Sequence, residues 1–404
     1  MTKLTSLLLP FCLLAGGCAS LSRNSVDITP QASLLASCHI PIGQQIDALA
    51  QPLVARGRTP GMVVALLQAG GQRQIFSYGF TDSDRRIPVT GDTLFAVGSI
   101  TKGFTAESAA LLVDEGKLRW NTTLGELADN PQALSADARQ ITLEQLATHT
   151  AGLPRQIPSL HMLRGLMTYL FTGAPFYDEL DRGDFRDYLR DFQRPAPRRV
   201  VYSNLGYSIL DYVITTGAQA SPQQIATQRI IAPLGMHHTG YQPSALPGYM
   251  LRARGHAGDQ PTFVRRGETV PDWQFSGYMV GAASLWSSAS DLLRYLDAHL
   301  NGSGRSDLDR AFAEAIAPRF RAPERDSAGL AWLVNEVNGQ KIVYQSGFIG
   351  GYASYIGMDV KHKTAIVVLQ NSFNWDNAVG HRMLLRMAAA SEHRCESATP
   401  PATR

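Results

Sequence analysis

The sequence predicts an α+β fold: strands from both ends of the chain form one antiparallel sheet flanked by helices, and a mostly helical lobe is inserted between them. Two strand-like runs lie within residues 61–80, and four more lie between residues 330 and 370. The segments between these two groups have mainly helical patterns. Because sites commonly form between lobes, we expect a functional cleft where the helical lobe meets the sheet.

The composition is that of an ordinary globular protein. The chain has 404 residues, of which 44% are apolar and 18% charged, so it is long enough for a large core and is not broadly disordered. The formal net charge is only +3, and no dense run of Lys or Arg stands out. These values argue against a nucleic acid or another polyanion as partner.

The N-terminus has the pattern of an export signal. Lys3 precedes an apolar run from Leu4 to Leu14 that is too short to span a bilayer, and small residues lead into Cys18. This predicts a lipoprotein-type signal peptide over residues 1–18, with a lipid on Cys18 as the membrane attachment. The alternative is an ordinary cleaved signal. In either case the mature protein is expected in the periplasm.

The rest of the chain is expected to form one folded domain between two tails. The ranges are a tether at 19–40, the domain at 41–392 with its helical lobe at about 117–285, and a C-terminal tail at 393–404. Cys38 and Cys395 flank the domain, and an oxidising compartment would permit a disulfide between them if the adjacent helices pack antiparallel. The alternative is two unpaired terminal cysteines.

The elements of the first half follow from local pattern. Gly61 to Ala69 is an apolar strand, Gly70-Gly71 is a hairpin signal, and Gln74 to Phe80 is the partner strand. A helix from Thr101 ends before Gly116. The inserted lobe then contains a short helix opened by Thr142, a helical insert at 155–200, helices at 204–217 and 221–232, and a loop-rich stretch at 236–283.

The second half returns to strand patterns. Ser288 caps a helix that runs through Leu300. Four short strands follow, at 330–337, 340–345, 352–358 and 364–370, with turns at Asn338-Gly339 and at 359–363, and a last helix lies near 375–390.

A serine and a lysine form the first chemical motif. Ser99 and Lys102 are three residues apart at the start of the helix predicted from Thr101, so their side chains share one helix face. Serine needs a nearby base to become a nucleophile, and a helix N-terminus offers backbone N–H groups to a developing oxyanion. Without further motifs, Ser99 reads equally well as a plain helix cap.

Two later motifs complement this pair. Tyr202-Ser203-Asn204 places a phenol, a proton carrier when cations lower its pKa, beside an amide that both donates and accepts hydrogen bonds. Gln345-Ser346-Gly347 ends a predicted strand, and Phe348 and the Gly350-Gly351 pair follow it. Glycines there let a ligand approach the strand edge. Taken alone, Tyr202-Ser203-Asn204 is equally typical of a packing aromatic residue followed by a helix cap, and Gln345-Ser346-Gly347 is equally typical of a glycine-rich turn.

The three motifs together resemble the serine β-lactamase and penicillin-binding protein superfamily. S-I-T-K at residues 99–102 and Y-S-N at 202–204 are similar to its branch of class C β-lactamases, DD-peptidases and esterases. Four further stretches are typical of that branch: 141–154, 202–214, 232–236 and 281–296. The resemblance covers roughly residues 45 to 390 and implies a β-lactamase/transpeptidase-like fold.

The resemblance also implies roles. Ser99 would be acylated by a carbonyl substrate, and Lys102 and Tyr202 would share the proton transfers. Asn204 would bind a substrate amide, and the backbone N–H groups of Ser99 and Phe348 would hold the oxyanion. The residues predicted to bind substrate are Asn204, Gln345, Ser346, Gly347 and Phe348. No cofactor is implied, and the substrate would be a β-lactam or a D-Ala-D-Ala peptide.

Gln345 departs from the branch, which usually has Lys or His at this position. A neutral amide gives weaker hydrogen bonds than a charged group, so recognition of a substrate carboxylate needs another explanation. A class C-like β-lactamase is the leading expectation. The alternatives are a DD-carboxypeptidase or endopeptidase, a carboxylesterase on the same scaffold, and a penicillin-binding receptor without turnover.

The remaining candidates are histidines and aromatic residues. His149 is expected to be a buried hydrogen-bonding residue rather than a catalytic one. His237, His238 and His256 lack a recognised metal-ligand spacing, so no metal site is predicted although Asp259 and Asp272 are near in sequence. The residues considered for the cleft rim are Trp273, Phe275 and Tyr278, with ordinary packing as the alternative.

Overall fold

A computed structural model describes most of the chain, and it covers residues 40–177, 182–196, 199–275, 277–320, 327–337, 339–375 and 378–392. The predicted signal peptide, Cys18, Cys38, Cys395 and the C-terminal tail lie outside these residues. In the described part, no helix is both long and apolar enough to cross a bilayer.

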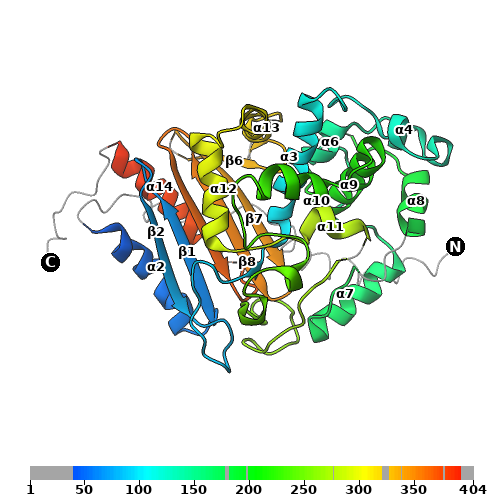
Figure 1. Cartoon of the computed structure of the whole chain (residues 1–404). Helices are drawn as coiled ribbons and strands as arrows, with labels where there is room; N and C mark the ends of the chain where they lie inside the picture. Colours follow the sequence, from blue (N-terminus) through cyan, green and yellow to red (C-terminus); the bar gives the residue numbers. More distant parts are fainter. Residues whose placement is uncertain are drawn as a thin grey trace, which may run out of the picture.

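One antiparallel sheet joins the two ends of the chain (Figure 1). Within the described residues its order is β2-β1-β9-β8-β7-β6-β5. The strands are β1 Gly61–Leu67, β2 Arg73–Gly79, β5 Ser327–Ala328, β6 Leu333–Val337, β7 Gln340–Ile349, β8 Tyr352–Asp359 and β9 Thr364–Gln370. The link between the termini is the β1–β9 ladder, in which Val64 pairs with Val368. The predicted fold class is therefore confirmed.

Strand β1 is buried on both faces, which explains its unbroken apolar sequence. Met62, Val64 and Leu66 join a core that contains residues of α2 (Ile42–Ala55) and α14 (Val379–Ser391). The alternate residues of β1 join the larger core on the other face. That face is covered by α12 (Ala289–Asn301) and adjoins α3 (Thr101–Asp114), as Figure 1 shows.

The inserted lobe consists of short helices and loops on one side of the sheet (Figure 1). Its helices are α4 Leu124–Leu127, α5 Ala136–Arg139, α6 Leu143–Ala147, α7 Leu160–Thr172, α8 Arg182–Arg190, α9 Asn204–Ala218, α10 Pro222–Ala226 and α11 Val280–Ala283, with a π-helical turn at Thr227–Ile231. Side-chain oxygens of Thr142, Ser203 and Ser221 cap α6, α9 and α10, so these helices begin where the sequence predicts.

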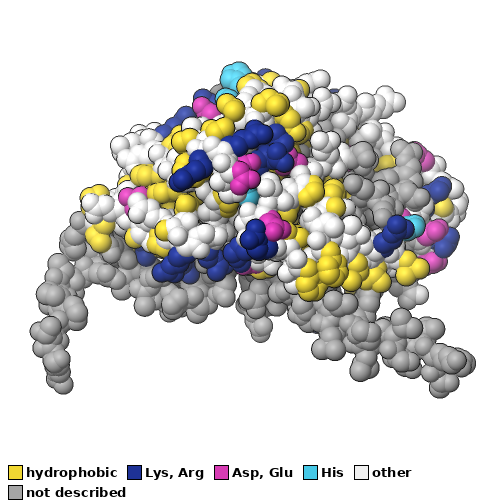
Figure 2. Space-filling view, turned by 90° about the horizontal axis from the view of Figure 1, so that it is seen from below, with side chains coloured by type: hydrophobic (Ala, Val, Ile, Leu, Met, Phe, Trp, Pro, Cys, Tyr) yellow, Lys and Arg dark blue, Asp and Glu magenta, His cyan; other side chains and the backbone are white. Residues whose placement is uncertain are grey.

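Two short strands and several tight turns complete the description. Strand β3 (Phe95–Ala96) pairs with β4 (Trp286–Ser287), and α13 spans Ser306–Ile316. Turns of 3₁₀ type occur at Gly98–Ile100 (η2), Pro131–Ala133, Pro243–Ala245, Tyr249–Leu251 and Gly277–Met279. Figure 2 shows that Lys and Arg side chains on the face viewed from below are interspersed with Asp and Glu, in keeping with the small net charge.

The third motif is the main difference from the sequence prediction. Gln345-Ser346-Gly347 was expected to end a strand, but β7 continues from Gln340 to Ile349 and pairs with β8 throughout the motif. The predicted strand end was wrong, because Gly347 lies inside β7 and is paired with Ser354 of β8. In the fold, the missing side chain instead lets the strand pass close to another segment of backbone.

Candidate active site

Ser99 and Lys102 lie at the junction of η2 and α3, where the helix begins. Their side chains meet, with 3.1 Å between Lys102 Nζ and Ser99 Oγ. Lys102 also donates a hydrogen bond of 2.7 Å to the backbone oxygen of Ala282, at the end of α11. The three-residue spacing on one helix face thus produces the predicted contact.

Burial gives Lys102 unusual acid–base properties. Its side chain is only 1% exposed, and this loss of water, reinforced by the positive charge of Arg155, holds the lysine pKa well below its usual range. A lowered pKa means a larger neutral fraction of the amine near neutral pH. Lys102 is therefore chemically suited to accept a proton from Ser99.

Tyr202 approaches this pair from a distant part of the chain. Ser203 anchors the position, because its hydroxyl accepts from Gly206 N at 2.8 Å and donates to Pro154 O at 2.6 Å. The Tyr202 ring centroid lies 5.0 Å from Lys102 Nζ and 4.9 Å from Arg155 Cζ. Two basic side chains, those of Lys102 and Arg155, therefore lie against the ring of the phenol that the sequence singled out.

His149 packs against the ring of Tyr202. It is 4% exposed, its Nδ1 accepts a 3.1 Å hydrogen bond from Ser203 N, and its ring centroid is 4.4 Å from that of Tyr202. Burial, together with the charges of Lys102 and Arg155, keeps its pKa well below the usual value, so the ring is neutral. The prediction of a buried hydrogen-bonding histidine is confirmed.

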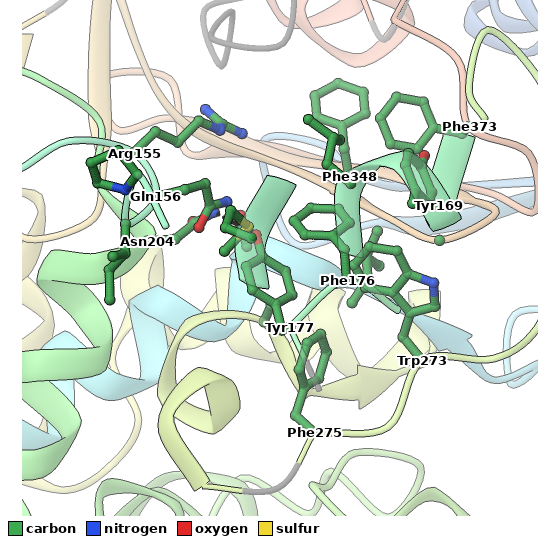
Figure 3. A pocket seen from close by; sticks show the side chains of 18 of the residues that line it. Arg155, Gln156, Tyr169, Phe176, Tyr177, Asn204, Trp273, Phe275, Phe348 and Phe373 are labelled. Carbon is green, nitrogen blue, oxygen red and sulfur yellow. Dashed lines mark hydrogen bonds between the residues drawn. The ribbon is translucent and has the colours of Figure 1, made fainter. Parts of the chain in front are cut away.

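Three polar side chains converge in the wall of a cavity that Ser99 also lines (Figure 3). Asn204 Nδ2 donates a 3.1 Å hydrogen bond to the Tyr177 hydroxyl, which also accepts from Gln156 Nε2. Burial raises the pKa of Tyr177 to about 12, so it remains a phenol. Asn204 Oδ1 is buried and has no hydrogen-bond partner among the described residues. It is positioned to accept a hydrogen bond from a ligand N–H.

A close approach of two backbones brings the predicted oxyanion donors together. A Cβ on Gly347 would lie 2.1 Å from Val97 O and 3.1 Å from Ser99 N, so only glycine fits there. Gly98 has a φ of +53°, and a Cβ on it would lie 3.2 Å from Phe348 N. The amides of Ser99 and Phe348 thus flank one contact between β7 and η2.

Gln345 takes no part in the cavity surface. It is 3% exposed and packs against α3, where a Cβ on Gly103 would lie 2.5 Å from Gln345 Nε2 and 3.1 Å from the Tyr295 hydroxyl. Of the third motif and its neighbour, Phe348 lines the cavity, whereas Gln345, Ser346 and Gly347 are not among its lining residues. Their contact with substrate stays a prediction.

A cavity of about 390 Å³ opens beside Ser99, and eight of its 19 described lining residues are aromatic. Figure 3 shows Arg155, Gln156 and Asn204 on one side, Phe348 and Phe373 opposite, and Trp273 and Phe275 below. The lining residues are Ser99, Arg155, Gln156, Ile157, Pro158, Met162, Leu166, Tyr169, Phe176, Tyr177, Asn204, Trp273, Phe275, Ala283, Phe348, Ile349, Gly350, Phe373 and Trp375.

Trp273 organises the apolar end of this cavity. Its ring stands edge-on to Phe176 and Tyr169, with centroid distances of 5.0 and 5.5 Å, and its Nε1 donates to Gly173 O. Trp273 and Phe275 lie in the wall, as considered from the sequence, while the Tyr278 side chain lies outside the described residues. Trp273, Phe275, Phe176 and Tyr169 thus pack as one group, called the aromatic chamber below.

Arg155, Gln156 and Tyr177 were not singled out in the sequence. One signal was available, because Arg155 and Gln156 directly follow the typical stretch 141–154. Within the described part of the chain, no three His, Cys, Asp or Glu side chains gather as metal ligands, and His256 Nδ1 lies 3.1 Å from Asn371 O.

A serine hydroxyl beside a buried amine, two nearby backbone amides and an apolar cavity are the features that a serine hydrolase requires. The sequence model of the Beta-lactamase family matches residues 46–390, and the chain belongs to that family. This confirms the resemblance seen in the three motifs.

Known proteins share the family at low identity. Protein flp of Staphylococcus aureus (strain MW2) is 23% identical over 338 residues, which cover 81% of this chain and 63% of that protein. Unguisins hydrolase ungD' of Aspergillus campestris is 26% identical, with 86% of this chain and 65% of the relative covered. The chain therefore spans less than two thirds of these relatives.

Solved structures show the same fold. A class C β-lactamase from Rhodobacter sphaeroides has a TM-score of 0.71 at 22% identity, covering 86% of this chain and 99% of the other.

Proposed function

We propose that the protein hydrolyses carboxylic esters with bulky apolar acyl groups through an acyl-enzyme on Ser99. The observation that carries the proposal is the 3.1 Å contact between Ser99 Oγ and the amine of Lys102, whose pKa is lowered by burial. Ser99 also faces the cavity, so a substrate carbonyl has access to it.

The proton steps follow from the positions of three side chains. Lys102 takes the Ser99 proton as Oγ attacks the carbonyl carbon, and the amides of Ser99 and Phe348 stabilise the oxyanion. The leaving oxygen then receives a proton from Tyr202 or Lys102 as the ester bond breaks. A water molecule attacks the acyl-enzyme with the same groups as base, and Ser99 is released.

The aromatic chamber supports the choice of acyl group. Its walls bury an apolar chain or ring next to the carbonyl, and each buried methylene contributes about 0.8 kcal/mol. We therefore expect kcat/KM to rise with acyl length until the chamber is full. Gln345 of β7 is neutral and does not line the cavity, so β7 offers the substrate no positive charge at this position. This supports a substrate that needs no such charge.

A second candidate is an acylamino substrate, either a β-lactam or a peptide ending in D-Ala-D-Ala. The specific observation is the buried Asn204 Oδ1, which would accept the N–H of the substrate's side-chain amide. Gln156 reaches the same tyrosine hydroxyl from the other side and adds a second amide to this corner. Class C-like β-lactamase activity belongs to this candidate.

The first experiment compares p-nitrophenyl acetate, butyrate and hexanoate with the chromogenic cephalosporin nitrocefin. Ser99→Ala is expected to lower kcat/KM at least 10³-fold on every substrate that the wild type hydrolyses, because no other group in the site forms the acyl bond. Ser108→Ala is the matched control, since Ser108 is a buried α3 serine bonded to Phe104 O and is not a cavity-lining residue.

Intact-protein mass spectrometry distinguishes the outcomes. A transient adduct on Ser99 with turnover of hexanoate supports the esterase, and turnover of nitrocefin supports the second candidate. A penicillin adduct that persists for hours without turnover would identify a receptor instead. Unchanged ester hydrolysis in Ser99→Ala would refute the proposal.

We also propose export to the periplasm with a lipid on Cys18, supported by the N-terminal sequence pattern. The mass of the mature protein tests both proposals. A diacylglyceryl cysteine at its N-terminus supports lipidation, an unmodified shorter chain supports simple cleavage, and a full-length chain in the cytoplasm refutes export. Non-reducing peptide mapping tests the Cys38–Cys395 disulfide.

A further inference from the structure

Asp211 is a buried carboxylate that the proposed proton steps do not use. It lies on α9 and is 8% exposed. Its Oδ2 accepts hydrogen bonds from the backbone N–H of Gly281, at 2.8 Å, and from Gln223 Nε2, at 2.6 Å. Thr215 Oγ1 donates a longer bond of 3.4 Å to its Oδ1. Asp211 therefore joins α9 to both α10 and α11.

The backbone that Asp211 binds is the same one that binds the amine of Lys102. Helix α11 has four residues, Val280–Ala283, and its N-terminus has no side-chain cap from its own N-cap residue. Ala282 directly follows Gly281, and its carbonyl accepts the 2.7 Å hydrogen bond from Lys102 Nζ. Thr105 of α3 donates to Gly281 O at 2.7 Å. Because so short a helix has few hydrogen bonds of its own, side chains from α3 and α9 determine its position.

The contact between α9 and α11 is tight. A Cβ on Gly281 would lie 2.6 Å from Asp211 Oδ2 and 2.9 Å from Asp211 Cβ, so glycine is needed for the backbone N–H to reach the carboxylate. Ala283, at the other end of α11, lines the cavity beside Ser99. A shift of α11 would therefore move Ala282 O and part of the cavity wall together.

We propose that Asp211 is a positioning residue, whose carboxylate fixes α11 so that Ala282 O holds the Lys102 amine against Ser99. The inference rests on the proposed function, in which Lys102 takes the Ser99 proton. Lys102 Nζ lies 3.1 Å from Ser99 Oγ, so a small displacement of its second partner is enough to turn the amine away from the hydroxyl. A misplacement of about 1 Å can lower a rate by about 10²-fold.

The surroundings of Asp211 decide the pH at which this role can be measured. Burial raises its pKa to about 6, although the bonds from Gln223, Gly281 and Thr215 act in the other direction. Burial, and after it the charge of Asp211, raises the pKa of Tyr241. Of the described α-helices against α9, α10 and α11 have no ionisable side chain, and the ionisable residues of the others are Lys102, Glu107 and Asp114 of α3, Glu126 of α4 and Glu144 of α6. Asp211 is therefore ionised at pH 8.

The test measures how fast Ser99 is modified by a fluorophosphonate probe in the mature protein. Ser99 Oγ forms a bond to phosphorus, fluoride leaves, and Lys102 takes the hydroxyl proton. The second-order rate constant reports on the nucleophile and its base without requiring turnover of an ester, and the unfolded fraction of a sample does not change it. Hydrolysis of p-nitrophenyl hexanoate is recorded in parallel, and both profiles run from pH 5 to pH 9.

Asp211→Ala should lower the probe rate at pH 8 about 10- to 100-fold. Asp211→Asn keeps an oxygen that accepts from Gly281 N–H, so its rate should stay within about threefold of wild type. In Asp211→Ala the acid limb should also move to lower pH, because the protonated amine loses its acceptor Ala282 O and the lysine pKa falls. Asp129→Ala is the matched control, since Asp129 is an exposed carboxylate that accepts from the Tyr212 hydroxyl of α9 and is not a cavity-lining residue.

Four results would overturn the inference: a wild-type rate in Asp211→Ala, an equal fall in Asp129→Ala, an equal fall in Asp211→Asn, or a lower rate with an unchanged acid limb. If Asp211→Ala does not fold, Gly281→Ala decides, because its Cβ must separate the backbone N–H from the carboxylate. A wild-type rate and acid limb in that variant refute the inference. A wild type that reacts with the probe but with no ester refutes the proposed function, and the probe rates then decide on Asp211 alone.

Discussion

Helix α3 carries two buried ionisable side chains, Lys102 and Glu107, whose surroundings are opposite in kind. Glu107 is 0% exposed, and its Oε1 accepts hydrogen bonds from the Tyr295 hydroxyl at 2.6 Å and Trp332 Nε1 at 3.3 Å and lies 3.0 Å from His299 Nε2, whereas its Oε2 is buried without a partner among the described residues. Lys102 is equally buried, but within the described residues its hydrogen-bond partners are a hydroxyl and a carbonyl, and no carboxylate neutralises it.

The difference shows how one helix serves stability in one place and chemistry in another. A buried acceptor shared by several donors contributes to stability, because its removal leaves those donors unsatisfied. A buried amine without a counter-ion has a lowered pKa and therefore a larger neutral fraction. The comparison predicts that substitution of Lys102 lowers mainly kcat/KM, whereas substitution of Glu107 lowers mainly the free energy of unfolding.

The largest effect is expected from Lys102→Met. Loss of the proton acceptor should lower kcat/KM on p-nitrophenyl hexanoate about 10²- to 10⁴-fold, the usual contribution of general acid–base catalysis. The free energy of unfolding should stay equal or rise, because a buried amine is replaced by an apolar side chain of similar length. Ester kinetics and urea denaturation measure the two quantities. A marked loss of stability with intact kinetics would reverse the comparison.

Glu107→Ala is expected to do the opposite. It leaves the Tyr295 hydroxyl and the Trp332 N–H buried without their acceptor, so the free energy of unfolding should fall by about 3–5 kcal/mol. The folded enzyme should keep kcat within a few-fold of wild type, since Glu107 does not line the cavity. Asp114→Ala is the control, because Asp114 is an exposed residue of the same helix whose ion pair with Arg310 of α13 is open to solvent and should contribute little to stability. Equal losses in both variants would contradict the prediction.

The smallest effect is a pH dependence of stability. The pKa of Lys102 is lowered in the folded state, so between the folded and unfolded pKa values the unfolded chain binds more protons, and stability rises with pH. The unfolding free energy of wild type minus that of Lys102→Met should therefore increase from pH 7 towards pH 10. The slope cannot exceed about 1.4 kcal/mol per pH unit for one group. A difference that is flat or falls with pH would show that the amine is not perturbed.

The parts of the site that were predictable are those set by local pattern. Ser99 and Lys102 meet because of a three-residue helical spacing, and β1 reads as a doubly buried strand from its own residues. Gln345 shows the limit of this approach, since its sequence position suggests a substrate contact but its side chain packs behind the wall.

The aromatic chamber and Arg155 could not be derived in the same way. The chamber combines Trp273 and Phe275 with Tyr169 of α7, which lies far from them in sequence, and no local period links them. The close passage of Gly347 along Val97 is likewise a property of two backbones meeting in space. Such features depend on the long-range packing of loops.

The ladder between β1 and β9 has a consequence for how the protein is made. Val64 and Val368 are roughly 300 residues apart, yet they are neighbours in the middle of the sheet. The ribosome must release almost the entire chain before the second partner exists, so the sheet is completed only after synthesis. The export proposed above would benefit from this order of events, because a chain whose sheet is still incomplete is unfolded enough to pass through a secretion channel.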